Sequence, residues 1–267
     1  MKKTIISCVL FLTAVTAFSQ TPMKTAAEAK LSASDLAVKI ADRILATTTY
    51  EFKNTKTGKT YKSVKNLPLD MNVKVACKYN NWHYTNGVTH IALMELADKT
   101  GAKKYDDYVL KNMNFVFNEG NLDFFKKQYE QAMKNEGWYG VRKLSWHMIF
   151  RGKRLDDNGP MGASLIDLQM KHPNNSFLNY INETAEHLNY GEPRLADGTI
   201  ARIWPHENTI WADDAFMAIS FLARMAKMTG DMSYINDAAN QVIKYHKYLW
   251  CPEKRILYHL SLIHISE

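Results

Sequence analysis

The chain has 267 residues and a formal net charge of +7, and its 46% hydrophobic and 23% charged content is ordinary for a folded globular protein. This length suits one large domain or two small ones. The mild positive charge points to no particular ligand, and nucleic-acid binding is not expected, because the sequence lacks a basic helix or an aromatic-basic segment.

Residues 1–19 have the pattern of a secretory signal peptide. Two lysines precede an apolar run from Ile5 to Phe18, which is too short to favour a transmembrane helix, and a small-residue cleavage site follows. Cys8 lies inside the run, so a lipid anchor is not expected. We expect the mature chain to begin near Gln20 and to be exported to a bacterial periplasm or the cell exterior.

Two cysteines, Cys77 and Cys251, remain in the mature chain. They can pair in an oxidising compartment or stay as two separate buried thiols, and the sequence leaves both alternatives open. Neither belongs to a pattern with metal-ligand spacing, so no metal site is expected.

The predicted elements are mainly helical. Ser32 or Ser34 caps a first helix over about 34–48, whose apolar positions follow a 3.6-residue period. The lysine-rich segment 52–66 is either a row of ligand-binding lysines or a solvated loop or hairpin. Its Gly and Asn content favours the loop or hairpin. Alternating strand patterns are scarce, and the further helices are predicted at about 86–100, 104–118, 122–134, 157–171, 175–189, 212–229 and 233–250.

The sequence contains an internal repeat. Trp82 and Trp211 are each followed after nineteen residues by a glycine, Gly101 and Gly230, and a third copy aligns Arg154 with the two tryptophans. Each copy predicts a loop, a helix, a tight turn and a returning helix. Because such hairpins cannot bury their apolar faces alone, we expect them to stack into a toroid or a solenoid.

Two pairs of acids occupy equivalent repeat positions, Asp156-Asp157 and Asp213-Asp214. In a toroid the loops before the first helix of every hairpin gather at one mouth, so the two pairs are expected to meet there. Each acid can also simply favour a helix start as a cap. One acid of each pair can cap while the other faces the cavity, with Asp214 as the expected cap in its pair.

The segment before the second pair is rich in Trp, Arg and His. Trp211 offers an aromatic platform for a sugar ring, and Arg202 can pair bidentately with a substrate carboxylate. His206 is either a substrate-binding residue or a surface histidine, and Met217 is either a ligand contact or a core residue.

Three stretches resemble the unsaturated rhamnogalacturonyl hydrolases of glycoside hydrolase family 105, which are relatives of the unsaturated glucuronyl hydrolases of family 88. They are RLDDNGPMGASL from Arg154, DGTIAR from Asp197 and TIWADDAFMAISFLAR from Thr209. The resemblance covers about residues 35–259. It implies an all-α fold, an (α/α)6 barrel formed as a six-hairpin toroid.

The resemblance also implies a reaction, the hydration of the C4=C5 double bond that a polysaccharide lyase leaves on a terminal uronic acid. Asp213 matches the general acid/base, and Trp211 and Met217 match its neighbours in the pocket. The second acid is Asp156 or Asp157. The repeat favours Asp156, because it is in register with Asp213, and Asp157 is then expected to bind substrate. No metal or organic cofactor is implied.

Three further residues are candidates for substrate binding. Trp82 and Tyr84 occupy the first repeat's positions equivalent to Trp211 and Asp213, and His259 matches a histidine that the family uses near the substrate. The alternative function is a noncatalytic helical carbohydrate-binding protein, or an inactive fragment, in which the acids only cap helices.

The resemblance stops before the end of the chain. The sequence predicts about eight of the twelve helices of such a barrel, so residues 20–259 are expected to be the N-terminal part of one catalytic domain. Residues 260–267 are expected to be a non-native tail. Unpartnered helix faces would expose apolar surface, so we expect this polypeptide to be poorly stable and inactive, and its parent to be a monomeric enzyme.

Overall fold

The computed structural model describes residues 32–152, 154–204 and 206–262. The expected signal peptide, residues 1–19, and most of the expected tail lie outside the described residues. The chain divides into two compact units, Met1–Ile40 and Ala41–Glu267, and helix α1 crosses the boundary. The predicted repeats and the candidate site residues all belong to the second unit.

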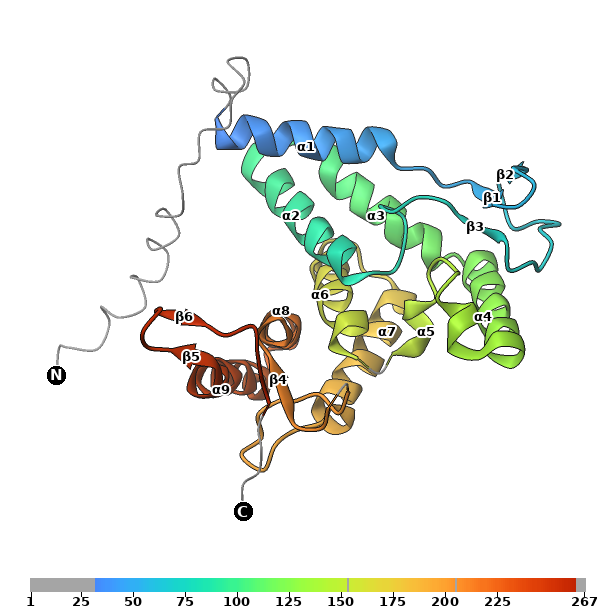
Figure 1. Cartoon of the computed structure of the whole chain (residues 1–267). Helices are drawn as coiled ribbons and strands as arrows, with labels where there is room; N and C mark the ends of the chain where they lie inside the picture. The colour runs from blue at the N-terminus through green and yellow to red at the C-terminus, as the bar shows by residue number, and fades with distance from the viewer. Residues whose placement is uncertain (1–31, 153, 205, 263–267) are drawn as a thin grey trace. The chain divides into compact units, whose positions relative to one another are not determined.

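The described residues form nine α-helices, a π-turn and seven short strands (Figure 1). The helices are α1 Ala33–Thr47, α2 Tyr84–Thr100, α3 Lys104–Val116, α4 Glu119–Val141, α5 Met148–Arg151, α6 Leu155–Lys171, α7 Asn175–Glu186, α8 Ala212–Thr229 and α9 Met232–Leu249, and the π-turn η2 is His187–Gly191. The strands are β1 Phe52–Asn54, β2 Thr60–Tyr61, β3 Val73–Val75, β4 Thr209–Trp211, β5 Trp250–Cys251, β6 Ile256–Leu257 and β7 Leu260–Leu262.

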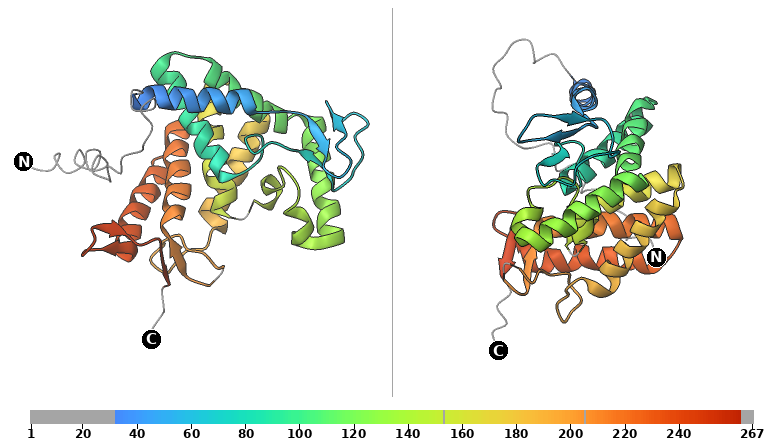
Figure 2. Two further views of the ribbon diagram at one scale, coloured as in Figure 1. Left: turned by 45° about the horizontal axis from the view of Figure 1, so that its top comes forward. Right: turned by 90° about the vertical axis from the view of Figure 1, so that its right-hand side faces the viewer.

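The predicted repeat is confirmed as three antiparallel helical hairpins, α2–α3, α6–α7 and α8–α9, and Figure 2 shows the last pair side by side. The first and third hairpins turn at Gly101 and Gly230, whose φ values of 70° and 76° favour glycine. Helix α6 packs between α2 and α8. The first helices of the three repeats are therefore neighbours, as stacking requires.

Several elements differ from the sequence prediction. Helix α4 is longer than predicted and is kinked at Gly137, where φ is 59°. Helix α7 ends at Glu186 and continues into the π-turn, and α5 was not predicted. In segment 52–66 the hairpin interpretation is confirmed, because β1 pairs antiparallel with β2; β1 also pairs with β3.

The two cysteines are unpaired: Cys77 is partly buried and Cys251 is buried. Strand β7 pairs antiparallel with β4, which precedes α8. No helix in the described part of the chain is long and apolar enough to span a membrane.

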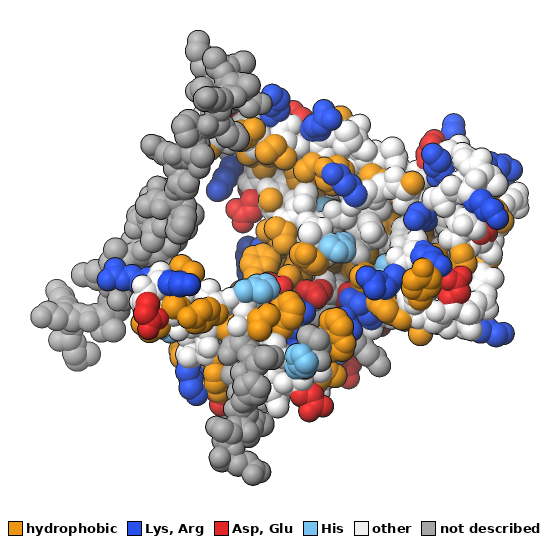
Figure 3. All heavy atoms as spheres, in the orientation of Figure 1, with side chains coloured by type: hydrophobic (Ala, Val, Ile, Leu, Met, Phe, Trp, Pro, Cys, Tyr) orange, Lys and Arg blue, Asp and Glu red, His pale blue; other side chains and the backbone are white. Residues whose placement is uncertain are grey.

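Large apolar side chains lie exposed on α9 and on the strands that follow it. Figure 3 shows apolar side chains on the face that carries β5 and β6. The exposed residues in this region include Met232, Val242, Ile243, Trp250, Ile256 and Leu257.

The packing of α6 against its neighbours depends on glycines. Gly87 on α2 faces the backbone of Pro160 and Met161, and Gly159 on α6 faces the backbone of Met217 on α8. A Cβ atom at Gly159 would lie 2.5 Å from the Met217 carbonyl oxygen, which real Cβ atoms do not do. These two glycines allow the backbones of three helices to approach closely.

Replacing Gly159 with alanine is therefore expected to destabilise the protein by about 1–3 kcal/mol or more, because the helices must move apart. Gly101→Ala is the matched control, because nothing lies within 4 Å of its Cβ position. It should cost only about 1 kcal/mol for its positive φ. Chemical denaturation of the three proteins measures the difference, and equal losses would contradict this account of the helix contact.

Candidate active site

The starts of helices α6 and α8 meet at one arginine, Arg202. It lies on the segment before β4, where isolated bridges pair Arg194 with Ile200 and Arg202 with Thr209. Its Nη2 atom lies 3.6 Å from Oδ1 of Asp156 and 3.8 Å from Oδ2 of Asp213. The predicted meeting of two acids from equivalent repeat positions is therefore found in the structure.

The second acid of each pair is buried and held by an arginine. Asp214 accepts hydrogen bonds from Nε and Nη2 of Arg202 at 2.6 and 2.7 Å, and its side chain is 2% exposed. Asp157, 1% exposed, accepts two hydrogen bonds from Arg151. Neither α6 nor α8 has a side-chain hydrogen bond at its N-cap. Asp214 lies in the first turn of α8, as its expected capping role requires, but among the described residues its carboxylate accepts hydrogen bonds from Arg202 instead of capping the helix.

The first acid of each pair is more accessible. The side chain of Asp156 is 27% exposed and that of Asp213 is 40% exposed. Oδ1 of Asp213 is buried and has no hydrogen-bond partner among the described residues. The two pairs thus share one pattern, in which the first acid is available for chemistry and the second is fixed in the wall.

Burial raises the pKa of Asp214 to about 6, and the neighbouring charge of Asp213 adds to the shift, while Arg202 acts against it. Burial also raises the pKa of Asp157, against the opposing effect of Arg151. Both carboxyls therefore depend on their arginines to remain ionised.

A cavity of about 600 Å³ opens beside these acids. Its wall contains Asp156, Asp214, Arg202, Glu192, His187, Arg151, Arg154, Trp138 and Trp204, with apolar residues between them. Asp213 is not among the residues that line the cavity, but it lies next to the wall, because it contacts Arg202. Arg154 stacks on Trp204, with its guanidinium carbon 5.1 Å from the ring centroid. The volume and the mixture of aromatic, cationic and acidic groups suit a small charged sugar.

The predicted platform residue Trp211 lies at this site. The guanidinium carbon of Arg202 is 4.3 Å from its ring centroid, so one side of the indole is already covered. His259 meets the same ring edge-on at 5.3 Å, and its carbonyl accepts a hydrogen bond from the N–H of Ala212. The structure thus brings Trp211, Arg202 and His259 together.

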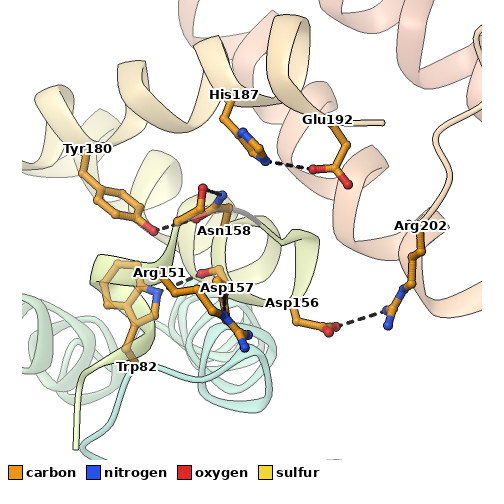
Figure 4. A network of polar contacts seen from close by, with 10 residues as sticks. Trp82, Arg151, Asp156, Asp157, Asn158, Tyr180, His187, Glu192 and Arg202 are labelled. Atoms are coloured by element: carbon orange, nitrogen blue, oxygen red, sulfur yellow. Dashed lines mark hydrogen bonds and ion pairs between the residues drawn. The ribbon is translucent and has the colours of Figure 1, made fainter. Parts of the chain in front are cut away.

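Four other predicted site residues lie elsewhere. Trp82 is fully buried, and its Nε1 donates to the Asp157 carbonyl at 2.8 Å (Figure 4), so it supports the start of α6 from the core. Met217 is also buried in the core, at the contact with Gly159. Tyr84 stacks against His83, and His206 is exposed on its loop; neither lines the cavity. The structure thus places Trp82 and Met217 in the core and Tyr84 and His206 at the surface, and their contact with substrate stays a prediction.

One buried acid of the cavity wall, Glu192, was not predicted from the sequence. It follows the π-turn, its side chain is 6% exposed, and Oε2 lies 2.9 Å from Nε2 of His187. Burial, with the nearby charge of Asp214, raises the pKa of Glu192 to about 8, despite the opposing charges of Arg194 and Arg202. The only sequence signal is the interruption of the helix by Gly191 and Pro193.

The chain is similar to known glycoside hydrolases in sequence and in fold. The sequence model of Glycosyl Hydrolase Family 88 matches residues 56–261. No curated protein matches significantly. Several solved structures share the fold, and three of them are described next.

The first is a possible member of the GH105 family from Salmonella enterica serovar Paratyphi A, with 14% identity and a TM-score of 0.54, covering 87% of this chain and 53% of that one. The second is a family 105 glycoside hydrolase from C. acetobutylicum, with 21% identity and a TM-score of 0.53. The match covers 86% of this chain and 49% of that one. The third is the GH76A α-1,6-mannanase from Salegentibacter sp., with 14% identity and a TM-score of 0.52, covering 88% and 57%.

These likenesses confirm the predicted fold class, an all-α barrel built from helical hairpins. The chain spans about half the length of the solved structures that it resembles. With a family match that covers most of its residues, the chain belongs to glycosyl hydrolase family 88.

Proposed function

We propose that this chain forms part of a glycoside hydrolase that removes an unsaturated uronic acid from oligosaccharides made by a polysaccharide lyase. We assign the substrate to the rhamnogalacturonan type, following the sequence resemblance. The observation that carries the proposal is the meeting of Asp156 and Asp213 on Arg202. Acids from two repeats on one cation beside a sugar-sized cavity support a catalytic site rather than two independent helix starts.

In the proposed reaction Asp213 delivers a proton to C4 of the unsaturated ring. Positive charge then develops at C5, where the ring oxygen stabilises it. A water molecule loses a proton to the same carboxylate and attacks C5, so the acid is regenerated. The hemiketal formed at C5 opens, and the next sugar leaves with its glycosidic oxygen.

Asp213 fits the proton-transfer role because neither of its oxygens is held in a hydrogen bond with the described residues. Asp157 and Asp214 are instead committed to Arg151 and Arg202. Asp156 is assigned as the second acid, since it lines the cavity and lies across Arg202 from Asp213.

Arg202 is assigned to the substrate carboxylate as well. Two of its nitrogens hold Asp214, whereas Nη1 makes no hydrogen bond with the described residues. A uronate that approaches Nη1 would complete a charge-assisted bond at the cavity wall. Trp211 keeps the guanidinium plane in place by stacking.

The test is an assay of the full-length gene product with unsaturated disaccharides of rhamnogalacturonan and glucuronyl type. Hydration destroys the conjugated double bond, so ultraviolet absorbance should fall, and fastest with the rhamnogalacturonan product. Binding of these sugars without loss of absorbance would instead support a noncatalytic carbohydrate-binding protein. An absorbance loss only with the glucuronyl product would overturn the substrate assignment.

A further inference from the structure

The wall of the cavity contains a carboxyl that the proposed reaction does not use. Buried Glu192 and partly buried His187 form a pair, with Oε2 and Nε2 2.9 Å apart (Figure 4). The other carboxyl oxygen points away from the histidine, on the side where Asp156 and Arg202 lie. Glu192 lines the same cavity as these two residues. An anchored carboxyl with one oxygen open to a cavity is arranged to contact a ligand.

The surroundings determine which ligand group this oxygen can bind. The titratable and charged groups around Glu192 are Asp156 on α6, His187 in η2, Arg194 and Arg202 in the next loop, Asp214 on α8 and Tyr245 on α9. Arg194 is bound to Asp237, and Arg202 is bound to Asp214, so neither pairs with Glu192. Burial and the two nearby aspartates therefore favour the neutral carboxyl up to about pH 8.

A neutral carboxyl has one O–H donor, and an uncharged sugar hydroxyl is the matching acceptor in a glycan-binding cavity. We propose that Glu192, anchored by His187, is a specificity-determining residue that donates a hydrogen bond to a hydroxyl oxygen of the bound sugar. This inference rests on the proposed function, because it places the sugar in the same cavity. His187 then acts as a positioning residue, since it orients the carboxyl through its hydrogen bond with Oε2.

The experiment measures KM and kcat of the full-length gene product on its unsaturated disaccharide. Glu192→Ala should raise KM by about tenfold with a smaller change in kcat, because one hydrogen bond to the sugar is lost. Glu192→Gln keeps a neutral donor at the same place and should recover most of the lost affinity. Glu186→Ala, an exposed acid just before the π-turn, is the control and should keep the original KM.

The pH dependence separates this role from a structural one. The KM of the unmodified protein should rise above about pH 8, where Glu192 loses its proton, and Glu192→Gln should abolish this rise. An unchanged KM in Glu192→Ala, or the same rise of KM at alkaline pH in Glu192→Gln, would overturn this inference but not the proposed function. Absence of activity in the unmodified protein would overturn the proposed function and this inference with it. If Glu192→Ala does not fold, the pH profile of Glu192→Gln still decides.

Discussion

Replacing Asp213 with asparagine is expected to lower kcat of the full-length gene product by about 10²- to 10⁴-fold. Asparagine has nearly the same shape but can neither deliver a proton to C4 nor accept one from water. The side chain is 40% exposed and makes only a 3.8 Å contact with Arg202, so folding should be unaffected. Steady-state kinetics on the unsaturated disaccharide and a thermal melt measure the two effects separately.

The adjacent residue is the matched control. Asp214→Asn changes the same functional group one position along α8, but it removes the buried partner of Arg202. Its main effect should be a loss of stability of about 1–3 kcal/mol, because Arg202 loses two charge-assisted hydrogen bonds and keeps only the longer contacts with Asp156 and Asp213. Asp213→Asn with ordinary activity would refute the assignment of the acid/base. An Asp214→Asn variant as stable as the original protein would refute the structural role of that pair.

The helical hairpins could be predicted from the sequence because their signals are local. The spacing from Trp82 to Gly101 equals that from Trp211 to Gly230, and a left-handed glycine ends both α2 and α8. The equivalence of Asp156 and Asp213 followed from the same spacing. Stacking of identical units then required the starts of α6 and α8 to be close, as the contacts with Arg202 confirm.

The finer arrangement of the site could not be predicted, because it depends on contacts between distant segments. An Asp at a helix start favours the helix dipole locally, but Asp214 pairs instead with an arginine twelve residues earlier in the chain. Trp82 looked like Trp211 in the repeat, yet it is buried against Trp146 and Tyr180. A repeated residue type therefore predicts a repeated position in the fold but not a repeated exposure.

Lowering the pH is expected to destabilise the protein through its buried histidines. His90 on α2 is fully buried, and neither ring nitrogen has a hydrogen-bond partner among the described residues. Burial lowers its pKa from 6.5 to about 4. His147 is buried as well, and burial, partly offset by a hydrogen bond to the Leu144 carbonyl, lowers its pKa to about 4. In the unfolded chain both imidazoles titrate near their ordinary pKa.

Because the unfolded state binds the proton more tightly, stability is highest above about pH 6.5 and falls as the pH approaches about 4. For His90 alone, the loss between about pH 7 and about pH 5 is roughly 2 kcal/mol. The raised pKa values of Glu192, Asp157 and Asp214 act in the opposite direction, since these carboxyls bind protons more tightly in the folded state. The pH dependence of stability is therefore the sum of opposing contributions, and a variant is needed to measure the contribution of His90.

The variant His90→Leu removes the contribution of this histidine to the pH dependence of stability, because leucine fills an apolar site and carries no ionisable group. Chemical denaturation of the full-length gene product at the two pH values should show that this variant loses about 2 kcal/mol less on acidification than the original protein. His206→Leu is the control, since that histidine is exposed, and its pH dependence should match the original. An unchanged acid sensitivity in His90→Leu would mean that His90 is solvated or paired in the folded protein, contrary to its place in the core.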